Sequence, residues 1–95
     1  MAGSQPMFVE ATGKGIILDP GGKPKLVPTS KLTKSYAFKA AIDAVANDDE
    51  MIMVFLIRQD GYSAFRRAES FARTNSAVVG KLPIIGKGKL DLSRF

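Results

Sequence analysis

The sequence predicts a small α+β domain, a two-layer sandwich in which a mixed sheet carries both helices on one face. Three observations lead to this fold class. Met51–Ile57 is an uninterrupted apolar run, typical of a strand that is buried on both faces. A segment with helical spacing precedes this run and another follows it. Short runs broken by Gly and Pro open the chain, so the expected order is ββαβαβ, with a possible last strand.

Two short strand candidates, residues 7–11 and 15–19, lie near the start of the chain. The three residues between them include a glycine, which predicts a β-hairpin in which Gly13 or Gly15 takes a positive φ angle. A turn rich in Pro and Gly follows. Residues 25–28 then form a candidate for a brief strand at a sheet edge, where a proline ends it.

The two helices are predicted from apolar residues that recur at three- and four-residue spacing. The first covers residues 35–47 and the second residues 61–74, with the carboxylate of Asp60 as the expected N-cap. Arg58, Asp60 and Gly61 would then form a structural strand-to-helix hinge. The expected buried stripes are Phe38, Ala41, Ile42 and Val45 in the first helix, and Phe65, Ala68, Phe71 and Ala72 in the second.

The last clear strand candidate, either one strand or a pair of strands, covers residues 77–85. Pro83 predicts an edge position for it, because proline has no N–H group for a sheet ladder. Strand, helix and strand in this half of the chain should form a right-handed crossover that leaves the two strands parallel. The alternating residues 90–92 indicate the possible final strand.

Length and composition describe one ordinary globular domain. Ninety-five residues support a single modest core, and the apolar fraction of 45% is typical of soluble proteins. Residues 1–6 are interpreted as a leader or a tag remnant, so a single domain is expected over residues 7–95. The chain has no cysteine and no histidine, which excludes disulfides and thiolate metal sites and removes the commonest general base.

The net charge of +5 lies entirely in the C-terminal part of the chain. Residues 1–57 carry six basic and six acidic side chains, whereas residues 58–95 carry eight basic and three acidic ones. Clustered basic side chains suit an anionic partner, although a solvated basic face is the commoner case. The candidate partner or anion surface comprises Arg66, Arg67, Arg73, Lys81, Lys87 and Lys89.

No catalytic residue, cofactor site or metal site is predicted. The stretch from Gly80 to Gly88 resembles a phosphate loop, but five residues instead of four separate Gly80 from Gly86, and no Ser or Thr follows the lysine. The serines have no histidine partner anywhere in the chain. We therefore expect a protein that is not an enzyme.

A small nucleic-acid-binding module, which uses the second helix and the following loop, is the alternative hypothesis. Its basic side chains would neutralise phosphates. Phe65 and Phe71, however, match the core stripe better than an exposed platform for base stacking. No RNP-like or GxxG signature is present.

Three segments, residues 8–11, 15–23 and 55–62, resemble the soluble C-terminal domain of a family of planctomycete-type proteins. That family opens with V-E-C-x-x-x-G-[VI]-x-L-x-P-x-G and ends a strand with L-[VI]-R-P-D-G. Residues 80–84 and 90–92 stand in the family's G-x-E-x-[IL]-x-x-x-x-x-L-D-[LF] tail. In this chain Ala11 replaces the cysteine, Gln59 the proline and Leu82 the acidic residue of the tail. The resemblance extends from Met7 to Leu92.

The element order and Ile57-Arg58-Gln59-Asp60 are also similar, more distantly, to the periplasmic domain of the ExbD/TolR biopolymer-transport family. That family ends a strand with I-R-A-D before its second helix. The resemblance implies a membrane-anchored, non-enzymatic domain that dimerises, with a periplasmic or envelope-exposed location. This chain would be only the soluble part, because the family's N-terminal membrane helix is missing from it.

The leading hypothesis is a non-catalytic protein-interaction domain, excised from a membrane-anchored envelope or transport-associated protein. An exposed sheet edge is the expected surface, where a protein partner or a second copy adds a strand. Nucleic acid is the less favoured partner, and no membrane span is expected within this chain.

Overall fold

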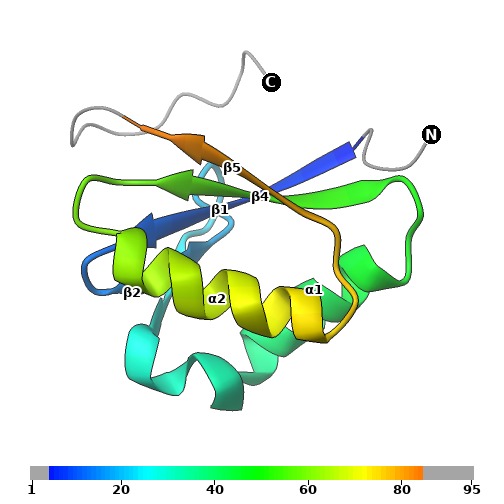
Figure 1. Cartoon of the computed structure of the whole chain (residues 1–95), viewed down its shortest axis with the longest axis horizontal. Coiled ribbons are helices and arrows are strands. Elements are labelled where there is room, and N and C mark those ends of the chain that lie inside the picture. The colour runs from blue at the N-terminus through cyan, green and yellow to red at the C-terminus, as the bar shows by residue number, and fades with distance from the viewer. Residues whose placement is uncertain (1–4, 85–95) are drawn as a thin grey trace.

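The computed structural model describes residues 5–84 and confirms the α+β class, with five strands in one mixed sheet and two α-helices (Figure 1). The elements follow the predicted order ββαβαβ with two additions, since the candidate edge strand at residues 25–28 forms and a 3₁₀-helix lies between it and the first α-helix. In chain order they are β1 (Gln5–Thr12), β2 (Gly15–Leu18), β3 (Lys25–Pro28), the 3₁₀-helix η1 (Thr29–Lys34), α1 (Tyr36–Ala46), β4 (Met51–Ile57), α2 (Tyr62–Thr74) and β5 (Val79–Pro83).

The strand order across the sheet is β3-β2-β1-β4-β5. β2 pairs antiparallel with both β1 and β3, whereas β4 pairs parallel with both β1 and β5. The apolar strand β4 has a neighbour on each side, but β1 and not β4 holds the middle of the sheet. The predicted parallel arrangement of the strands before and after α2 is confirmed.

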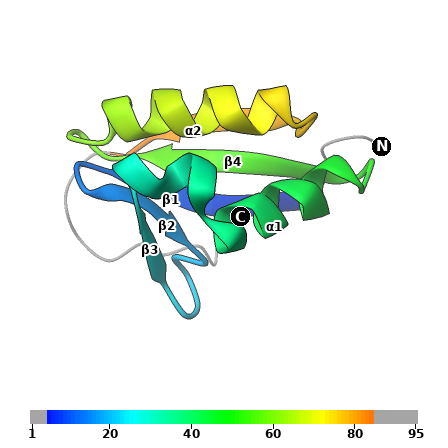
Figure 2. The same ribbon diagram turned by 90° about the horizontal axis from the view of Figure 1, so that it is seen from below.

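Alternation along the strands separates two faces of the sheet. Val9 and Ala11 of β1, with Met53 and Phe55 of β4, are fully buried in one apolar core. Both helices contribute to that core, so they cover the same face, and the other face carries no helix within residues 5–84 (Figure 2). The helical residues buried in it are Phe38, Ile42 and Val45 of α1, and Ala64, Phe65, Ala68 and Ala72 of α2.

The first helix begins and ends within one residue of its predicted bounds. Ser35 is its N-cap, and its Oγ accepts a hydrogen bond from the Phe38 N–H at 3.1 Å. The polar segment before it was not predicted as a helix, but residues 29–34 form η1. Leu32 of η1 is buried in the core, and this apolar contact holds the short helix against the domain.

The N-terminal hairpin has the predicted form. Gly15 takes a φ angle of +148°, and a Cβ atom there would lie 2.1 Å from the Val27 carbonyl oxygen, so no other residue fits. β1 begins at Gln5, two residues before the expected start, and the Gln5 N–H donates to the Glu50 carbonyl at 2.7 Å. The predicted final strand, residues 90–92, lies outside the described residues.

No helix within residues 5–84 combines the length and the apolar character that crossing a bilayer requires.

Candidate interaction surfaces

Residues 58–61 connect β4 to α2, but the predicted capping of α2 by Asp60 is wrong. Gly61 is the N-cap of α2, and no side chain caps this helix. The Gly61 N–H donates to the Arg58 carbonyl at 2.9 Å, and a Cβ atom on Gly61 would lie 2.0 Å from the Ala11 carbonyl oxygen. Close contact between the turn and β1 therefore requires glycine at the cap. Asp60 instead lies beside Gly13, in the turn between β1 and β2.

Arg58 of the hinge makes a contact that the sequence did not reveal. Its Nε atom donates to Oε2 of Glu10 in β1 at 2.7 Å. Both side chains are nearly buried on the face of the sheet opposite the two helices, since the neighbouring Val9 and Ala11 face the helical core. A charge-assisted hydrogen bond of this kind links the end of β4 to β1.

The three predicted arginines of α2 are all exposed. Arg73 lies 3.5 Å from a carboxylate oxygen of Glu69, one turn earlier on the helix. The guanidinium of Arg66 lies 6.0 Å from the centroid of the Tyr62 ring. Lys81 of β5 joins this surface, because its Nζ atom lies 6.0 Å from the centroid of the Phe65 ring. Lys87 and Lys89, the remaining predicted members, lie outside the described residues.

A groove of about 470 Å³ separates η1 from α2. It combines two arginines with several hydroxyl groups, which can donate hydrogen bonds to an anion, and its described lining contains no carboxylate. The lining residues are Thr29, Ser30, Leu32, Thr33, Arg66, Arg67, Ser70, Phe71 and Thr74. Sequence reasoning missed the contribution of η1, because only tertiary packing brings these hydroxyls beside α2.

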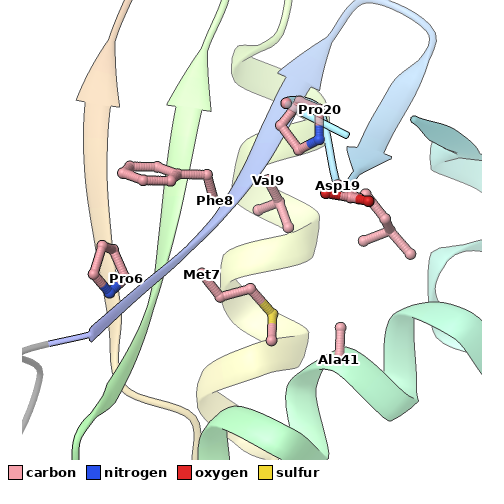
Figure 3. A pocket seen from close by; sticks show the side chains of 9 residues that line it. Pro6, Met7, Phe8, Val9, Asp19, Pro20 and Ala41 are labelled. Atoms are coloured by element: carbon pink, nitrogen blue, oxygen red, sulfur yellow. The ribbon is translucent and has the colours of Figure 1, made fainter. Parts of the chain in front are cut away.

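A second hollow, also of about 470 Å³, lies between β1, the turn after β2 and α1 (Figure 3). Its described lining is largely apolar, and Asp19 is the one ionisable residue in it. The Asp19 carboxylate accepts a hydrogen bond from the Lys23 N–H at 2.9 Å, so it stabilises the turn. Within residues 5–84, no three acidic side chains gather closely enough to hold a metal ion.

β5 forms one edge of the described sheet, as Pro83 predicts. The Val78 carbonyl accepts from the Met53 N–H at 2.9 Å, and the Ile84 N–H donates to the Ile57 carbonyl at 2.8 Å. Backbone groups alternate in direction along a strand, so even-numbered residues of β5 bond to β4. The N–H groups of Val79 and Lys81 therefore point away from β4.

Comparison with protein-family models, with curated proteins and with solved structures gave no match. The geometry defines a small α+β domain with a basic helix face, a groove lined by arginines and hydroxyls, and a sheet edge at β5. The relationship to the ExbD/TolR family stays a prediction.

Proposed function

We propose that the chain is a non-catalytic protein-interaction domain that binds an extended segment of a partner protein along the edge of β5. The observation that carries the proposal is the direction of the Val79 and Lys81 N–H groups, away from β4. A partner strand would accept hydrogen bonds from them and donate to the neighbouring carbonyls. Val78 and Leu82 keep 52% and 38% of their surface exposed and offer apolar contact area to such a segment.

The opposite edge of the described sheet is less suited to strand addition. β3 has four residues, ends in Pro28, and follows directly after Pro24. Proline lacks a backbone donor, and natural proteins protect sheet edges with short strands, prolines and lysines. This contrast supports β5 as the binding edge.

A membrane-anchored envelope protein is the proposed parent of the domain, and the resemblance to the ExbD/TolR family supports this part of the proposal. An antibody against the domain, applied to membrane and soluble fractions of the source cells, tests it. Detection in the membrane fraction, resistant to high-salt washing, is expected, whereas detection in the soluble fraction alone contradicts it.

The strand-addition proposal is tested by Lys81→Pro, which removes a donor that points away from β4. The matched control Lys81→Ala removes the same charge but keeps the N–H group. Fluorescence anisotropy with a short labelled peptide of alternating valine and threonine should show binding that Lys81→Pro weakens by about tenfold, or 1.4 kcal/mol. Lys81→Ala should retain it. Equal affinities of the two variants, or no binding at millimolar protein, would contradict the proposal.

Nucleic-acid binding is the second candidate, and the groove between η1 and α2 favours it. Arg66 and Arg67 line this groove beside hydroxyl groups that can donate to phosphate oxygens. The double change of both arginines to glutamate should abolish retention of single-stranded DNA at low salt. The control Arg73→Glu, outside the groove lining, should weaken it much less. Absence of DNA or RNA binding by the unmodified protein at low salt dismisses this candidate.

A further inference from the structure

We infer that the segment bound at β5 carries acidic side chains on the face turned towards α2 and apolar side chains on the opposite face. This inference rests on the proposed strand addition and names the chemistry of the partner. It follows from the side chains that flank the β5 edge on each face of the sheet.

Odd-numbered residues of β5 face α2. Val79 packs against the core that both helices share. The Nζ atom of Lys81 lies 6.0 Å from the centroid of the Phe65 ring, which is itself buried edge-on against Phe55, with the ring centroids 5.4 Å apart. Residues of an added strand directly opposite Val79 and Lys81 would point to the same face.

The α2 side of this edge is positively charged. Phe65 also contacts the exposed Tyr62, with ring centroids 6.0 Å apart, and the Arg66 guanidinium lies 6.0 Å from the Tyr62 ring. Lys81 and Arg66 thus flank one aromatic pair. No carboxylate of the described chain forms an ion pair with either cation. An Asp or Glu side chain of a partner strand, opposite Lys81, would supply the missing negative charge.

The other side of the edge is apolar. A Cβ atom on Gly80 would lie 3.3 Å from Cδ1 of Ile52, which places Gly80 on the face opposite α1 and α2. Leu82 pairs in register with Leu56 and is partly exposed. On this face, every second side chain of an added strand would lie next to Gly80 and Leu82. Apolar side chains of the partner at these positions would bury apolar surface against the sheet.

The position of Lys81 also opposes pairing between two copies of this chain. Lys81 is the middle residue of β5, so an antiparallel two-fold pairing in full register places it opposite Lys81 of the second copy. Like charges that face each other across two strands are destabilising. A partner with acidic residues is favoured over self-association for this reason.

Two short peptides test the inference, one alternating valine with glutamate and one alternating valine with lysine. At low salt the unmodified protein should bind the glutamate peptide about tenfold more tightly than the lysine peptide, a difference of 1.4 kcal/mol. Lys81→Glu should invert this preference. Lys34→Glu on η1, an exposed lysine with the same change of net charge, should preserve it. Lys81→Pro should weaken both complexes, and circular dichroism checks that each variant is folded.

The possible failures are distinguishable. Equal affinity for the two peptides, with sensitivity to Lys81→Pro, overturns the inference and leaves strand addition standing. If the glutamate peptide binds tightly and Lys81→Pro does not weaken this binding, the attraction lies away from β5. This result also overturns the inference. If neither these peptides nor the valine–threonine peptide binds, strand addition itself is wrong.

Discussion

Arg58 donates a hydrogen bond from Nε to Oε2 of Glu10 across 2.7 Å, with only 11% and 12% of the two side chains exposed. The two residues lie 48 positions apart in the chain, at the end of β4 and in β1. Their contact lies on the face of the sheet that carries no helix within residues 5–84. A nearly buried ion pair of this kind makes the Glu10 carboxylate dependent on Arg58, because an unpaired carboxylate there would be poorly solvated.

Glu10→Ala should lower the free energy of unfolding by about 2 kcal/mol, because it removes a charge-assisted hydrogen bond of 2.7 Å in a nearly buried site. Replacing both residues, as Glu10→Leu with Arg58→Met, should cost much less than the sum of the two single changes. Urea unfolding measures both effects. The control Asp43→Ala breaks an exposed pair with Lys39 and should cost only about 0.5 kcal/mol. A loss for Glu10→Ala as small as that of the control contradicts the prediction.

Gly61→Ala should destabilise the domain by about 3 kcal/mol, because its Cβ would meet the Ala11 backbone, which cannot rotate away. Gly80→Ala is the matched control. Its Cβ would lie 3.3 Å from the flexible end of Ile52, so its effect should stay within about 1 kcal/mol. Thermal unfolding compares the two variants, and similar melting temperatures for both would count against the close contact at Gly61.

Ser35→Ala should cost about 1 kcal/mol, because the Ser35 hydroxyl caps the Phe38 N–H at the start of α1. Asp60→Ala should cost much less, since no side chain caps α2. The free energies of unfolding, measured in urea at neutral pH, decide between these expectations. A larger loss for Asp60→Ala than for Ser35→Ala would restore the capping role that the sequence alone predicts.

Phe38→Ala should destabilise the domain by about 4 kcal/mol, because the fully buried Phe38 ring would leave a cavity beside Phe71. Tyr36→Ala, two residues earlier on the same helix, removes the ring of a residue that is 89% exposed and should change stability by about 0.5 kcal/mol or less. Calorimetry or urea titration distinguishes the two. Equal losses would mean that α1 does not pack on the sheet as described.

The helical spacing and the breaker residues were sufficient to predict most elements. Both helices begin within one residue of their predicted starts, and Phe38, Ile42, Phe65 and Ala68 all lie in the core. These features depend on residues close together in the chain, where periodicity directly reports which side chains share a face. η1 was missed because its six residues include a single buried apolar side chain, too few for a periodic pattern.

The candidate surfaces were predictable only in part. The exposure of Arg66, Arg67 and Arg73 follows from their place opposite the apolar stripe of α2. The contact of Lys81 with the Phe65 ring could not be predicted, because it depends on how β5 returns beside α2. The misassigned N-cap has a similar cause, since an aspartate before a helix is a good local signal. Contact with Ala11, which is distant in the chain, decided the position of the turn instead.

From local patterns alone, this chain is an α+β domain with a buried apolar strand, two amphipathic helices and an excess of basic side chains in its second half. Tertiary packing added the middle position of β1, the Glu10–Arg58 pair, the groove between η1 and α2, and the charged and apolar sides of the β5 edge. The difference has one physical reason. Periodicity and turn chemistry act over a few residues, whereas strand order and side-chain contacts depend on which distant segments bury apolar surface together.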